Sequence, residues 1–150
     1  FFNYLIGESK KKLIFNIYSD PNLSSRFVLK KNQYISKNNI IRDQLVTKHE
    51  CQMYPLDYFK KKLNKNIIIS IDVQGGEYEV LKGCKKLFLE GLIKIIILEV
   101  SNIEIYKKKQ QPIFSLLKKN NFSFIKKVPG YTHKNKVIEY DYIFKHEKLI

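Results

Sequence analysis

The stretch SIDVQGGEYEVLKG, residues Ser70 to Gly83, decides the fold that we expect for this chain. It continues directly from three isoleucines, and the resulting run 67–73 is apolar apart from Ser70 and Asp72. Such a run is typical of a parallel strand covered by helices on both faces. The two glycines that follow permit a tight turn. The stretch therefore predicts a strand, a sharp corner and a helix, with a carboxylate at the end of the strand.

The elements downstream of this corner alternate between helix and strand. Apolar residues at helical spacing predict one helix from Glu77 to Glu90, stopped by Gly91. After it we expect a strand at 93–100, a helix at 112–121 beginning with Pro112, and strands at 122–128 and 137–144. This order predicts an α/β fold with parallel crossovers. The last connection is too short for a helical crossover, so the last strand should run antiparallel to its predecessor.

The N-terminal third gives weaker patterns. Residues 1–6 and 13–18 are expected to be strands that pair as a hairpin, and 46–53 a further strand. The segment 30–39 is rich in lysine and asparagine and is expected to be a surface loop. Pro55 is expected to begin a short helix.

Two carboxylates are placed where this class of sheet binds ligands. Ligands of open α/β sheets lie outside the carboxyl ends of the strands, where Asp72 and Glu99 are expected. A carboxylate that ends an apolar run is costly to bury without a purpose, which favours a functional Glu99. Asp72 has an alternative role as a helix cap. Glu79 is expected to be only a helix-start acid, and Gly83 a site of close packing between helix and sheet.

Composition excludes several classes of function. The formal net charge is +14, but Arg26 and Arg42 are the only arginines. Specific phosphate and base contacts favour arginine, so we do not expect nucleic-acid binding. The two cysteines form no CxxC pair, and we expect no metal site. No apolar run is long enough to span a membrane, and a reducing, cytoplasmic location is expected.

The segment IDVQGGEYEVLKG resembles the signature of the FkbM-type methyltransferases. Further segments resemble the same family: NLSSRF (22–27), YPLDYF (54–59), IILEVSNIEIYKKKQQ (96–111), VPGY (128–131) and EYDYIF (139–144). Some positions depart from the family pattern, since Gln74 stands where many members have glutamate, and Leu5 and Glu8 stand where alanine and aspartate are usual.

The resemblance implies methyl transfer from S-adenosylmethionine to a hydroxyl of a sugar, lipid-linked or natural-product acceptor. It implies a Rossmann-like methyltransferase sheet whose last strand lies antiparallel beside the fifth. On this basis Asp72, Glu99 and Asp141 are expected to converge on one rim as catalytic candidates. The cofactor-binding candidates are Asp72, Gln74 and Gly75, and the acceptor-binding candidates are Ser24, Ser25, Glu77 and His133.

The family's first strand and glycine-rich loop have no counterpart in this sequence. We therefore expect residues 1–150 to be one partial methyltransferase domain, its C-terminal portion, inactive by itself. The partner expected from the resemblance is a small-molecule or glycan acceptor. Two alternatives remain: a non-catalytic remnant or interaction module of the same fold, and a lysine-rich binder of anionic surfaces.

Overall fold

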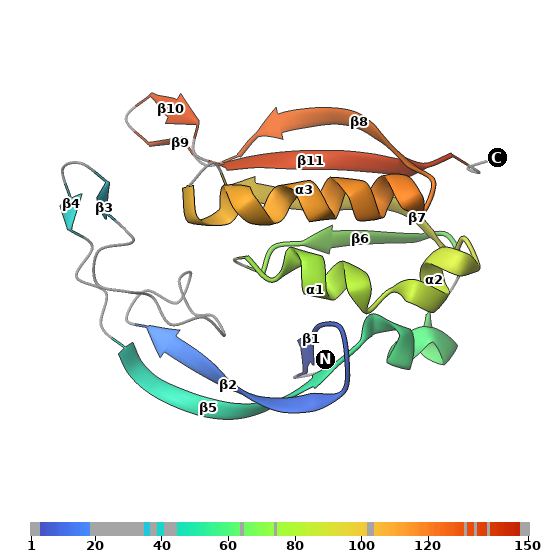
Figure 1. The fold of residues 1–150 in the computed structure, drawn as a ribbon, viewed down its shortest axis with the longest axis horizontal. Helices are drawn as coiled ribbons and strands as arrows, with labels where there is room; N and C mark the ends of the chain where they lie inside the picture. The colour runs from blue at the N-terminus through green and yellow to red at the C-terminus, as the bar shows by residue number, and fades with distance from the viewer. Residues whose placement is uncertain are drawn as a thin grey trace.

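The computed structural model describes residues 4–18, 35–36, 39–40, 45–63, 65–73, 75–101, 104–130, 132–133, 135–137 and 139–147. Within these ranges the chain is a mixed α/β structure, with parallel and antiparallel strands in two main sheets (Figure 1). No helix in these ranges is long and apolar enough to cross a membrane.

The larger sheet has the strand order β6-β7-β11-β8. Its strands are β6 (Ile67–Ile71), β7 (Ile93–Ser101), β8 (Phe122–Pro129) and β11 (Glu139–His146). Strands β6 and β7 are parallel, whereas β11 lies between β7 and β8 and is antiparallel to both. The predicted antiparallel last strand is therefore confirmed, because its connection to β8 is too short to cross over.

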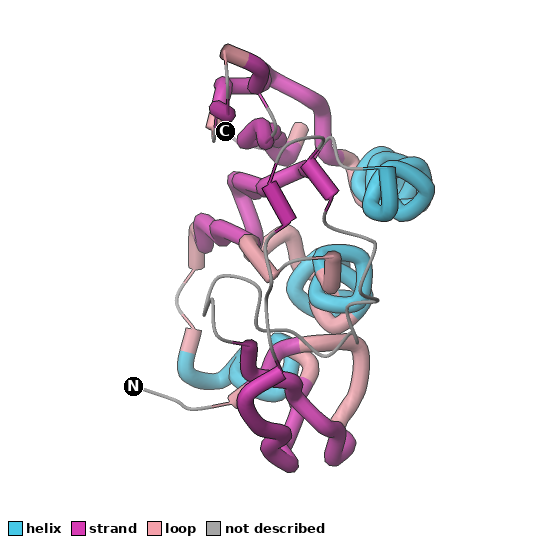
Figure 2. The backbone as a smooth tube through the Cα atoms, turned by 90° about the vertical axis from the view of Figure 1, so that its left-hand side faces the viewer, coloured by secondary structure: helices cyan, strands magenta, loops and turns pink. Residues whose placement is uncertain are grey.

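One face of this sheet carries the core. Helices α1 (Glu77–Lys82) and α3 (Glu104–Lys119) lie on the same side of the strands (Figures 1 and 2). Three side chains of the core between the helices and the sheet are completely buried: Ile96, Leu98 and Leu117. The prediction of helices on both faces is wrong for the described residues: Ile71 points into the core, but Ile68, on the opposite face, is 61% exposed.

The predicted helix from Glu77 to Glu90 is two helices, α1 and α2 (Lys85–Leu89), separated at Gly83. At this break the carbonyl of Gly83 accepts a hydrogen bond from the N–H of Asp57 (3.0 Å). The backbone of Gly7 packs so closely there that a Cβ on Gly83 would lie 2.1 Å from its carbonyl oxygen. Close packing at Gly83 was predicted, although the partner is the N-terminal segment. Asp57 holds α2 in its new direction by accepting hydrogen bonds from the backbone N–H groups of Lys86 (2.9 Å) and Leu87 (3.0 Å).

Helix α3 is longer than the sequence indicated. It begins at Glu104, and Pro112 lies inside it instead of at its start. Proline removes one helical hydrogen bond, but burial of Ile113 and Leu117 against the sheet holds the helix through this position. The predicted end is confirmed, since Asn121 has a positive φ of 60° and the chain turns there.

The second sheet has the order β1-β5-β2. Its strands are β1 (Leu5–Ile6), β2 (Lys11–Tyr18) and β5 (Leu45–Tyr54). The predicted hairpin of the first two strands is wrong: β1 pairs in parallel with β5, and β2 pairs with the other edge of β5. Gly7 extends the pairing of β1 with β5, because its N–H donates a hydrogen bond to the carbonyl of Tyr54 (2.9 Å).

The remaining elements are short. A 3-10 helix, η2 (Leu56–Lys62), follows Pro55 as expected. Strands β3 (Ile35–Ser36) and β4 (Asn39–Ile40) form a two-stranded ribbon within the segment expected to be a loop. Strands β9 (Thr132–His133) and β10 (Lys136–Val137) form a hairpin between β8 and β11.

Candidate active site

Asp72 and Glu99 are neighbours at the carboxyl ends of two parallel strands. The last paired residues of β6 and β7 are Ile71 and Leu98, and Asp72 and Glu99 are the next residue on each strand. Both side chains point to the face opposite the helical core, because Ile71 and Leu98 are buried in that core. A hydrogen bond joins the two carboxyl groups when Glu99 is protonated.

Strand β11 adds two more carboxylates to this rim. Asp141 is the cross-strand partner of Glu99, and Glu139 is the partner of Ser101. Since residues two apart on a strand share a face, Glu139 and Asp141 lie on the face of Glu99. We call Asp72, Glu99, Glu139 and Asp141 the carboxylate rim.

Crowding of negative charge favours the protonated state in this rim. The pKa of Glu99 is raised to about 7, first by burial and then by the charges of Asp72, Glu139 and Asp141. The hydrogen bond to Asp72 raises it further. Burial and the charges of Asp72 and Asp141 also raise the pKa of Glu139 above its ordinary value. At neutral pH one of these carboxyl groups is thus poised to hold or release a proton.

The glycine corner after β6 has the tight geometry expected from the sequence. Gly75 has a positive φ of 89°, which glycine adopts without strain. Its N–H donates to the Glu77 carboxylate at 2.7 Å. Helix α1 begins after Gly76, which is its N-cap residue and has no side chain to cap it. The alternative role of Asp72, as an N-cap-like residue for this helix, stays a prediction.

The other predicted site residues are placed only in part. Ser24, Ser25 and Gln74 lie outside the described residues, as does the side chain of His133, whose backbone belongs to β9. The carboxylate of Glu77 accepts a hydrogen bond from the N–H of Gly75 in the glycine corner. Among the described residues no group of histidine, cysteine and acidic side chains could hold a metal ion.

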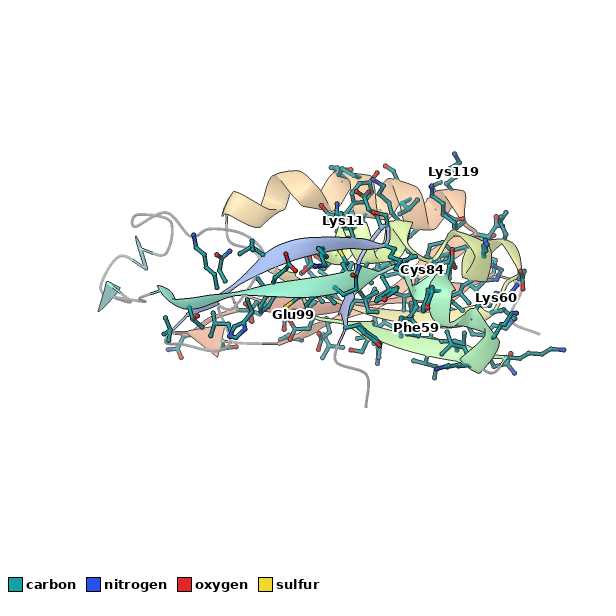
Figure 3. All side chains as sticks on the ribbon, turned by 90° about the horizontal axis from the view of Figure 1, so that it is seen from below. Lys11, Phe59, Lys60, Cys84, Glu99 and Lys119 are labelled. Carbon is teal, nitrogen blue, oxygen red and sulfur yellow. The ribbon has the colours of Figure 1, made fainter. Side chains whose placement is uncertain are left out.

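Glu139 is the rim residue that the sequence analysis missed. Its signal was present in EYDYIF, because strand alternation places Glu139 on the same face as Asp141. The rim lies apart from several of the basic residues: Figure 3 shows Glu99 well separated from Lys60 and Lys119.

Comparison with known proteins gives one result. A family model described as the methyltransferase FkbM domain matches residues 2–125. The chain belongs to the FkbM methyltransferase domain family. No curated protein and no solved structure matches it. The FkbM match includes Asp72 and Glu99 and ends before β11, so Glu139 and Asp141 join the rim through the strand order.

Proposed function

We propose that this protein is an S-adenosylmethionine-dependent methyltransferase that methylates a hydroxyl group of a sugar, lipid-linked or natural-product acceptor. The observation that carries the proposal is the Asp72–Glu99 pair at the carboxyl ends of adjacent parallel strands in an FkbM-family chain. This is where open α/β sheets bind their ligands. The insertion of β11 antiparallel beside β7 supports assigning the sheet to the Rossmann-like methyltransferase class.

The chemistry of the rim fits one end of this cofactor. The methyl-bearing sulfonium and the amino group of S-adenosylmethionine are positively charged, and a group of carboxylates attracts both. Asp72 and Glu99 are the residues best placed to face this end. Two further contacts are proposed: Gly75, which has no side chain and so allows close approach to its backbone, and Gln74. When bound, the cofactor would supply a methyl group activated by the positive charge of its sulfur.

The residues of this chain would orient the acceptor and manage its proton. A hydroxyl within hydrogen-bonding distance of Asp72 or Glu99 would be held for reaction, and this positioning is expected to supply much of the rate enhancement. The carboxylate that accepts the hydroxyl proton should have a pKa near the working pH, as Glu99 does. We propose Asp72 and Glu99 as the proton-handling pair, with Asp141 as a supporting carboxylate. Ser24, Ser25, Glu77 and His133 stay candidates for acceptor contacts.

The proposal is tested in the full-length protein, because residues 1–150 are expected to be inactive by themselves. Methyl transfer is measured from S-adenosylmethionine carrying a labelled methyl group to a panel of hydroxyl-bearing acceptors. Asp72→Asn should lower turnover by roughly 100-fold or more, because it removes a charged hydrogen-bond acceptor from the reacting hydroxyl. The control is Glu90→Gln after α2, where the exposed Glu90 pairs with Lys60; this change should leave turnover unchanged. Unchanged turnover in Asp72→Asn would remove Asp72 from the mechanism. Absence of both cofactor binding and transfer would favour the non-catalytic alternative.

A further inference from the structure

Glu139 occupies a defined place beside the proton-handling pair. Its register partner Ser101 follows Glu99 by two residues on β7, so Glu139 is a diagonal neighbour of Glu99 on the same face. Diagonal neighbours on a sheet have Cα atoms roughly 7–8 Å apart, within reach of long side chains. Glu139 is half-buried, which keeps its charge from being fully screened by solvent.

The backbone of Glu139 is fixed by the turn that ends β8. The N–H of Gly130 donates to the carbonyl of Glu139 at 2.8 Å. The backbone segments at Gly130 and Glu139 approach so closely that a Cβ on Gly130 would lie 3.2 Å from that carbonyl oxygen. The β9–β10 hairpin leaves the sheet after Gly130 and returns at Glu139. Glu139 is therefore anchored at the base of this hairpin.

The charged groups that face Glu99 can be read from the strand register. Strand β6 contributes Asp72, and β11 contributes Glu139 and Asp141. The helices pack on the opposite face. On the open face the lysines that the register places are Lys126, opposite Ile143, and Lys145, opposite Ile95. Neither lysine contributes to the raised pKa of Glu99. Among the described residues, the surroundings of Asp72 and Glu99 are therefore dominated by negative charge.

We propose that Glu139, anchored by Gly130, is a positioning residue whose negative charge keeps one proton shared between Asp72 and Glu99 at neutral pH. This inference rests on the proposed function for its biological meaning, but the charge relationship is measurable without any reaction. A shared proton holds the two carboxyl groups together and leaves their remaining oxygen atoms as hydrogen-bond acceptors for a hydroxyl of the acceptor. Without the charge of Glu139, Glu99 would ionise more readily at neutral pH and lose its hydrogen bond to Asp72.

The experiment follows the side-chain carboxyl carbon of Glu99 by NMR during a pH titration of the full chain labelled at glutamate. The unaltered protein should give a midpoint near 7 for Glu99. Glu139→Gln keeps the shape and removes the charge, so the midpoint should fall by roughly half a pH unit or more. Glu139→Asp keeps the charge and should restore most of the shift. An unchanged midpoint in folded Glu139→Gln would overturn the proposal.

The matched control is Glu147→Gln, which removes the same charge just beyond the far end of β11 and should leave the Glu99 midpoint in place. If Glu139→Gln does not fold, the unaltered protein still decides. The Glu99 midpoint should then lie near 7, and a Glu99 midpoint near 4.5 would overturn the proposal. Methyl transfer is measured separately, so its absence would count against the proposed function without altering the titration result.

Discussion

Asp72 and Glu99 lie side by side on adjacent parallel strands, and their carboxyl groups share a hydrogen bond when Glu99 is protonated. The negative charge of Asp72 disfavours the ionisation of Glu99 and so raises the pKa of Glu99. The pair therefore combines a hydrogen-bond donor and an acceptor near neutral pH. The proposed chemistry depends on this relationship.

The first prediction concerns stability and pH. The pKa of Glu99 is about 7 in the folded chain and ordinary in the unfolded chain, so the folded state binds more protons between these values. Stability should therefore decrease as the pH rises from about 4.5 to about 7. Glu99→Gln mimics the protonated form and should remove part of this decrease. Thermal unfolding at several pH values should show the variant gaining stability relative to the parent as pH rises; a constant difference would contradict the prediction.

The second prediction concerns Asp57, whose carboxylate accepts the N–H groups of Lys86 and Leu87 at the start of α2. Asp57→Ala leaves both donors without this acceptor and should lower the free energy of unfolding by about 1–2 kcal/mol. Asp57→Asn retains one acceptor oxygen and should cost less. Chemical denaturation would measure both changes. Equal stability of Asp57→Ala and the parent would show that the cap is not important for folding.

The third prediction compares two glycines. Gly83→Ala would place a Cβ 2.1 Å from the backbone oxygen of Gly7, so the N-terminal segment would have to move. The expected cost is about 2–3 kcal/mol of unfolding free energy. The matched control is Gly76→Ala, where the nearest atoms are 3.4 Å away, an ordinary contact. Similar denaturation midpoints for the two variants would refute the close packing at Gly83.

The fourth prediction concerns the two thiols. Cys84 is completely buried, and burial raises the pKa of its thiol to about 12. Cys51 lies on β5 and is half-exposed. A thiol reagent should therefore modify Cys51 in the native protein and reach Cys84 only after unfolding. Mass spectrometry of the native and denatured protein would test this, and native labelling of Cys84 would show that its surroundings open readily.

The sequence predicted the larger sheet well where local pattern and topology agree. The runs at 67–71 and 93–101 are strongly apolar, and the short connection before β11 permits only one direction. The two apolar runs predict Asp72 and Glu99 at one edge of the sheet, whereas the expectation that Asp141 joins them came from the family resemblance, which implies that the last strand lies beside the fifth. Glu139 was missed although strand alternation places it on the face of Asp141; that it also lies diagonal to Glu99 depends on the register of β11 with β7, which the sequence of β11 does not reveal.

Other errors came from contacts between distant segments. The helical periodicity of the sequence continues through Gly83, although the helix breaks there, where the backbone of Gly7 packs closely and the N–H of Asp57 bonds the Gly83 carbonyl. Pro112 stands inside α3 because packing of the helix outweighs the missing hydrogen bond. The pairing of β1 with β5 in place of β2 depends on where a long connection returns, which local pattern does not record. In each case tertiary contact overrode the local preference.

The central claim is that the rim holds a proton at neutral pH because Asp72 and Glu99 are neighbours. The most direct measurement is the carboxyl-carbon NMR titration of Glu99 in the unaltered protein and in Asp72→Asn. We predict a midpoint near 7 that falls when the charge of Asp72 is removed. A midpoint near 4.5 in the unaltered protein, unaffected by Asp72→Asn, would contradict the account.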